Sequence, residues 1–158
     1  MVVDPIEKKL RETDKKRKRL TILICGLIGL CAIFYMIRFP VAMANWIVPF
    51  EVQNPTYVPL DVENSYASTG GWNTVQMVYE NDNQKIRIWA STKAGTSASE
   101  TTEKVMLNDE KQANYSAEGL SQHLSFRKGD VLYSIEYSGT GLVTKEELIK
   151  MANSINQK

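Results

Sequence analysis

Metal-binding and nucleophilic residues are scarce in this sequence. It has one histidine, His123, and two cysteines, Cys25 and Cys31, with no pair among them at metal-ligand spacing. Neither the G-x-S-x-G nucleophile motif nor the G-x-G-x-x-G phosphate-binding loop occurs. We therefore expect no bound metal, no cofactor and no enzymatic activity.

Disulfides are excluded from most of the chain, because no cysteine follows Cys31. Both cysteines lie in a long apolar run, where we interpret them as small apolar residues; palmitoylation or pairing with another membrane protein is the alternative. Small secreted domains in oxidising compartments often contain disulfides. The cysteine-free remainder therefore suits a bacterial surface domain better than an ectodomain made in the secretory pathway.

The C-terminal body also lacks an excess of basic residues. Residues 1–19 carry eight Lys and Arg against four Asp and Glu, a net charge of plus four, whereas the chain from Phe39 onward has a net charge of minus four. Nucleic-acid-binding domains usually carry a basic patch, so we expect no nucleic-acid partner. The cluster at residues 15–19 could serve as a nuclear-localisation or nucleic-acid patch, but its position beside an apolar run favours a topology signal.

That apolar run, Leu20–Ile37, has eighteen residues and no charge. As a helix it would span about 27 Å, close to the hydrocarbon thickness of a bilayer. A core helix of a small domain would keep a polar stripe instead. The run therefore predicts a transmembrane helix at residues 20–37, preceded by a basic cytoplasmic head at residues 1–19 that contacts membrane lipid.

Ala42-Met43-Ala44 has the small-x-small pattern that signal peptidases cut. However, the apolar run is longer than a typical signal-peptide core of about 7 to 15 residues. Arg38 and Trp46 are also residue types that suit the membrane–water interface. These features favour an uncleaved single-pass anchor with the C-terminal domain outside the cell membrane. Cleavage to a secreted protein that begins at Asn45 stays open as the alternative.

Three prolines, Pro49, Pro55 and Pro59, favour extended and turn-rich backbone after the anchor. Residues 38–59 are therefore predicted to form a juxtamembrane stalk, and residues 60–158 an extracytoplasmic domain. In that domain, alternating apolar and polar residues predict two hairpins and two shorter strands. The hairpins pair residues 74–79 with 85–90 and residues 120–126 with 131–138, and the short strands are residues 104–107 and 113–115.

A helix is expected after the last strand, because Thr144 and Glu147 have the spacing of a capping box. One face of this helix is apolar and contains Leu148, Met151, Ala152 and Ile155. The predicted fold class is therefore α+β: one N-terminal transmembrane helix, then an antiparallel sheet packed against a C-terminal helix.

One face of the predicted sheet points away from that helix and is mostly polar. Four residues on it form a candidate binding face: Val78, Trp89, His123 and Leu132. Exposed apolar groups on a polar sheet face can mark a ligand or partner surface. The alternatives are that these side chains are scattered, or that a loop such as residues 94–102 covers them, with His123 simply solvated.

Several segments resemble a known family through their order and spacing. They are PTYVP (55–59), MVYEN (77–81), VMLND (105–109), QANYS (112–116), residues 124–139 and TKEELIKMANSI (144–155). Together they resemble small extracytoplasmic domains of unassigned function, found at the outer ends of Gram-positive anti-sigma-factor proteins and on sporulation-associated lipoproteins. The resemblance implies half of a lipoprotein-carrier-like fold and supplies no catalytic residues.

These observations favour a non-enzymatic, membrane-tethered binding or sensing module whose partner is an envelope protein or ligand. A structural or assembly subunit of an envelope or secretion complex is the main alternative. In that case Gly26 and Gly29 would let the membrane helix approach a neighbouring helix closely.

Overall fold

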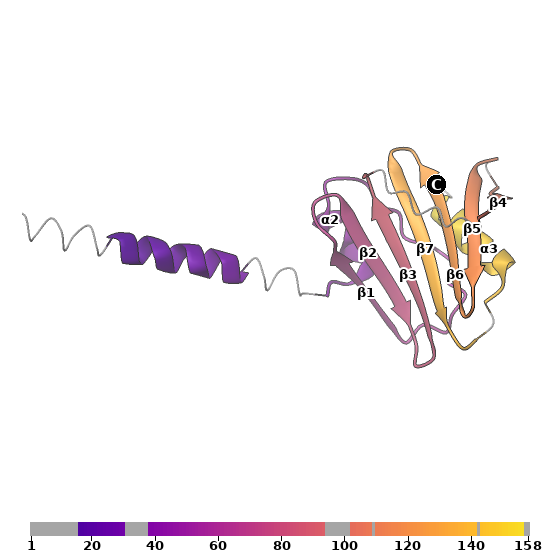
Figure 1. Cartoon of the computed structure of the whole chain (residues 1–158), viewed down its shortest axis with the longest axis horizontal. Helices are drawn as coiled ribbons and strands as arrows, with labels where there is room; N and C mark the ends of the chain where they lie inside the picture. Colours follow the sequence, from indigo (N-terminus) through magenta and orange to yellow (C-terminus); the bar gives the residue numbers. More distant parts are fainter. Residues whose placement is uncertain (1–15, 31–37, 94–101, 109, 142, 157–158) are drawn as a thin grey trace, which may run out of the picture. The chain divides into compact units, whose positions relative to one another are not determined.

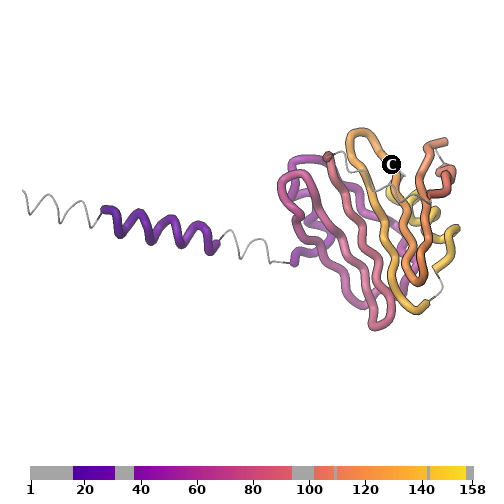
Figure 2. Tube along the Cα trace, viewed as in Figure 1, coloured from indigo at the N-terminus to yellow at the C-terminus, as the bar shows by residue number. Residues whose placement is uncertain are grey.

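The computed structural model describes residues 16–30, 38–93, 102–108, 110–141 and 143–156. The chain divides into two compact units, Met1–Ile37 and Arg38–Lys158, which are described separately here. Figures 1 and 2 follow the chain through both units.

In the first unit, residues 16–30 are α-helical. The apolar side chains along this helix, among them Ile22, Leu23 and Leu27, are exposed. Within the described part of the chain, no helix is long and apolar enough to cross a membrane. The helix predicted at residues 20–37 includes residues 31–37, which lie outside the described residues.

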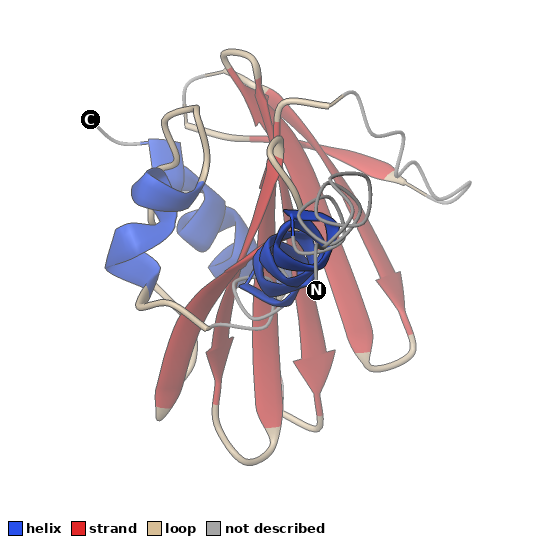
Figure 3. Ribbon diagram, turned by 90° about the vertical axis from the view of Figure 1, so that its left-hand side faces the viewer, coloured by secondary structure: helices blue, strands red, loops and turns tan. Residues whose placement is uncertain are grey.

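The second unit is built on a seven-stranded sheet (Figures 1 and 3). Its strands are β1 (Asn64–Thr69), β2 (Thr74–Glu80), β3 (Gln84–Ser91), β4 (Glu103–Met106), β5 (Gln112–Glu118), β6 (Ser121–Lys128) and β7 (Val131–Gly139). Their order is β1-β2-β3-β7-β6-β5-β4, and every neighbouring pair is antiparallel. Both predicted hairpins and both short strands are present, and β1 extends the sheet beyond the prediction.

Alternation along the strands places one set of apolar side chains on a single buried face. On β2, β3 and β7 this set is Val75, Met77 and Tyr79, then Ile86, Ile88 and Ala90, then Tyr133, Ile135 and Tyr137, all at most 8% exposed. The predicted phase of these strands is confirmed. Leu120, expected on the same side, is 67% exposed because it lies in the turn before β6.

The C-terminal helix α3 (Lys145–Asn156) lies on the buried face, where it contacts β6 (Figure 3). Its first turn closes as a capping box: the Thr144 N–H donates to Glu147 Oε2 at 2.8 Å, and the Glu147 N–H donates to Thr144 Oγ1 at 3.2 Å. The four predicted core residues of the helix are fully buried: Leu148, Met151, Ala152 and Ile155. The helix, its cap and its packing face are thus as predicted.

Residues 39–60, which we call the covering segment, also pack on the buried face. The segment begins with η1 (Val41–Met43) and α2 (Ala44–Ile47), and Ala44, Val48 and Val52 belong to the hydrophobic core. Further along, the Gln53 N–H donates to the Tyr133 hydroxyl at 3.0 Å and the Tyr57 N–H donates to Ser154 Oγ at 3.2 Å.

The covering segment therefore corrects the stalk predicted for residues 38–59. The prolines do favour extended backbone here. However, Ala44, Val48 and Val52, at every fourth position, are buried in the hydrophobic core, and this burial holds the segment against the sheet. The compact unit begins at Arg38 and not at residue 60.

Candidate functional site

The face of the sheet opposite α3, which we call the open face, carries all four residues of the predicted binding face. Strand register arranges its side chains in rows across the sheet. One row contains Gln76, Trp89, Ser134 and Ser125, and the next contains Tyr66, Val78, Arg87, Glu136 and His123. Leu132 lies between Ser91 and Arg127 in a third row. The β3–β7 pairing thus brings the two predicted hairpins together.

Two polar contacts connect the middle of the open face. Arg87 Nη1 donates to Glu136 Oε1 at 3.3 Å, and His123 Nε2 lies 2.6 Å from Ser134 Oγ. Burial lowers the pKa of His123 below its usual value of 6.5, and the nearby Glu136 carboxylate opposes this only in part. The centre of the face therefore holds one ion pair and an imidazole that is mostly neutral at pH about 7.

The four predicted residues differ in their exposure. Val78 is only 2% exposed, which corrects the expectation of an exposed apolar side chain. The reason is its register position between Tyr66 and Arg87, whose long side chains flank it on both sides. Trp89, His123 and Leu132 are half-buried and keep part of their surface accessible. Val78 is therefore covered by its neighbours on the open face, whereas the other three side chains keep accessible surface.

The Ser134–His123 contact raises the question of nucleophilic catalysis. Such a pair needs a third group that orients the imidazole, and hydrogen-bond donors for a developing oxyanion. Glu136, the acidic residue in register with His123, is engaged by Arg87, and the strand β7 is paired on both sides by β3 and β6. No group of three or more His, Cys, Asp and Glu side chains in the described ranges could hold a metal ion.

The sequence analysis missed the contribution of β1 to this face. Tyr66 stands beside Val78, and the Arg38 guanidinium lies 4.3 Å from the centre of the Tyr66 ring, at cation–π distance. The only local signal is the alternation around Tyr66 and Ala67, because the rest of β1 consists of Asn, Ser and Thr.

Two of the depressions on the second unit lie outside the predicted binding face. One, of about 380 Å³, is lined by residues that already bond to one another across α3 and the covering segment: Lys150 Nζ lies 4.1 Å from the Tyr57 ring centre, and Ser154 Oγ accepts from the Tyr57 N–H. The other, of about 390 Å³, has an acidic rim that includes Asp61 and Asp82. Neither includes a residue of the predicted binding face.

Comparison with known protein families finds one match. A family model described as "Domain of unknown function (DUF4367)" matches residues 52–155, from the middle of the covering segment through the sheet to α3. Neither the comparison with curated proteins nor that with solved structures gives a match.

Proposed function

The chain belongs to the DUF4367 family, and from that premise we propose that it is a membrane-anchored, non-enzymatic binding module that presents the open face of its sheet outside the cell. The family description names no activity; the geometry of the domain and the patterning of the N-terminal residues support the proposal.

The observation that carries the proposal is the difference between the two faces of the sheet. α3 and the covering segment close one face, while the other keeps Trp89, His123 and Leu132 partly accessible around the Arg87–Glu136 ion pair. Trp and Arg are among the residue types that contribute most at protein interfaces. Because these side chains are spread over three neighbouring strands, the face suits the broad surface of an envelope protein.

The N-terminal residues support the anchor. The uncharged run at residues 20–37 is long enough to span a bilayer, and the eight basic residues before it favour a cytoplasmic N-terminus that contacts lipid. Retention of the run is supported by the folded domain. Cleavage after Ala44 would remove a residue that is fully buried and would also remove Phe39, whose backbone is paired with Ala67.

The resemblance to the outer domains of Gram-positive anti-sigma-factor proteins and sporulation lipoproteins supports a position outside a bacterial cell. The absence of cysteine after residue 31 fits such a domain better than a small ectodomain made in the secretory pathway, where disulfides are frequent.

Protease treatment of intact, wall-stripped cells tests the topology. The domain beginning at Arg38 should be degraded, and a tag placed before residue 16 should be spared. Protection of the domain would contradict the proposed orientation. N-terminal sequencing of the mature protein should begin near Met1, and a start at Asn45 would mean that the anchor is removed.

Photocrosslinking in living cells tests the open face. A photoreactive amino acid in place of Leu132 of the full chain should give a discrete adduct with an envelope protein. The same amino acid in place of Leu120, which is 67% exposed but lies in a turn, is the matched control and should not. Trp89→Ala should reduce the adduct at position 132 without changing the protein level. Equal adducts at positions 120 and 132 would remove the open face as the binding surface.

A further inference from the structure

Two tryptophan rings of the second unit, Trp46 and Trp72, are 85% and 83% exposed. Trp46 lies on α2, where Ala44 and Ile47 contact the core, so its ring points away from the sheet. Trp72 lies in the loop that joins β1 to β2. Trp is amphipathic and contributes large apolar area when it is covered, so two such rings in one region indicate a surface that has a partner.

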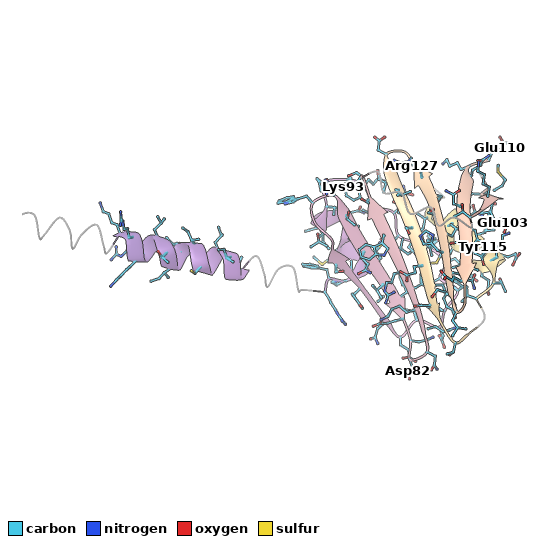
Figure 4. The ribbon with its side chains drawn as sticks, viewed as in Figure 1. Asp82, Lys93, Glu103, Glu110, Tyr115 and Arg127 are labelled. Carbon is cyan, nitrogen blue, oxygen red and sulfur yellow. The ribbon has the colours of Figure 1, made fainter. Side chains whose placement is uncertain are left out.

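Both rings belong to the same side of the domain, which we call the β1 edge. α2 contacts β1 and β2, and Trp72 lies in the turn between these two strands. The loop of Trp72 also lies beside the end of β3, since the Thr92 N–H donates to the Asn73 carbonyl at 3.1 Å. Lys93 follows at this end of the sheet, and Asp82 marks the opposite end (Figure 4).

The chain enters the domain at the same edge. Phe39 and Ala67 of β1 exchange two backbone hydrogen bonds, with N···O distances of 2.8 and 2.6 Å. Arg38 is the only residue between this bridge and Ile37, the last residue of the apolar run. In the sequence, a single residue therefore separates the apolar run from the bridge at the β1 edge.

We infer that the β1 edge is a lipid-docking surface, an inference that rests on the proposed membrane anchor. Trp46 and Trp72 insert into the membrane–water interface, where Trp is favoured, and the exposed Arg38 and Lys93 contact anionic headgroups. In this orientation the edge strand β1 lies nearest the bilayer, and the other edge strand, β4, lies farthest from it. This orientation leaves the open face accessible from the side and fixes its height above the membrane.

Fluorescence quenching by brominated lipid tests the docking directly. Three full-length variants, each keeping one tryptophan and carrying Phe at the other two positions, are reconstituted into vesicles of phosphatidylcholine and phosphatidylglycerol with plain or brominated acyl chains. Trp46 and Trp72 should lose fluorescence in the brominated vesicles, and Trp89, on the open face, is the internal control and should not. Replacing phosphatidylglycerol by phosphatidylcholine should weaken the quenching at Trp72, as should Lys93→Gln.

The outcomes separate this inference from the anchor on which it rests. Retention of the chain in vesicles after an alkaline wash, without quenching at Trp46 and Trp72, overturns the docking and leaves the anchor standing. Equal quenching of all three tryptophans also overturns it, because the domain would then contact lipid without a defined edge. Loss of the chain from the washed vesicles overturns both the anchor and the docking.

Discussion

The two faces of the sheet differ in burial, and adjacent residues of one strand lie on opposite faces. Ile88 and Trp89 are neighbours on β3, yet Ile88 is fully buried in the core and Trp89 is half-buried on the open face. Burial of apolar area on the core face stabilises the fold. The open face buries less apolar area, so we expect it to contribute less to stability. Substitutions on the two faces should therefore have separable effects.

The largest expected difference is between those two neighbours. Ile88→Ala removes fully buried methyl groups and should lower the free energy of unfolding by about 2–5 kcal/mol. Trp89→Ala should cost less than Ile88→Ala and below about 3 kcal/mol, because part of the ring is already in water. Denaturant unfolding of the full chain in mild detergent, followed by circular dichroism, measures both. A larger loss for Trp89 would show that it is a core residue and that the two faces are equivalent.

Two substitutions in α3 test whether this helix packs on the buried face of the sheet. Ile155→Ala should lower the free energy of unfolding by about 2–4 kcal/mol, because this side chain is fully buried between the helix and the sheet. Lys150 is the control on the exposed side, where its ammonium lies over the Tyr57 ring. Lys150→Ala should cost about 0.5–1 kcal/mol, the size of an exposed cation–π contact. Equal losses would mean that α3 does not pack through the Ile155 face.

A smaller effect is expected at the start of the same helix. Thr144→Ala removes the side-chain acceptor for the Glu147 N–H and should cost about 0.5–2 kcal/mol. Thr144→Ser keeps the hydroxyl and should restore most of the loss. If the two variants are equally stable, the capping box contributes little to holding α3 over the core.

The smallest effect concerns pH and the open face. Because the folded-state pKa of His123 lies below 6.5, the unfolded chain takes up a proton before the folded chain does as the pH falls. The contribution of neutral His123 to stability is thus complete above pH 6.5 and is lost as the pH falls through the lowered folded-state pKa. His123→Gln should therefore lose less stability than the parent chain between pH about 7.5 and about 5. Identical pH profiles would show that His123 is not desolvated.

Local sequence patterns were sufficient to predict much of the secondary structure of the second unit. Period-two alternation predicted β2, β3, β6 and β7 and their buried faces, and the Thr144–Glu147 spacing predicted the cap of α3. β1 was missed because only Tyr66 and Ala67 interrupt its polar residues, and its strand pairing comes from β2. Of the four residues of the predicted binding face, Trp89, His123 and Leu132 are partly accessible and Val78 is buried; their role in binding stays a prediction.

The spacing of apolar residues along a single element was enough to predict the buried side of β2, β3, β6 and β7 and the packing face of α3. The separation of the chain into a basic head, an apolar run and a mildly acidic body is likewise a matter of composition. Tertiary structure alone decided the β3–β7 pairing, the burial of Val78 by flanking side chains, and the packing of residues 39–60 on the sheet. Each of these depends on residues far apart in the chain, and a local pattern carries no information about which distant surface will be present to cover it.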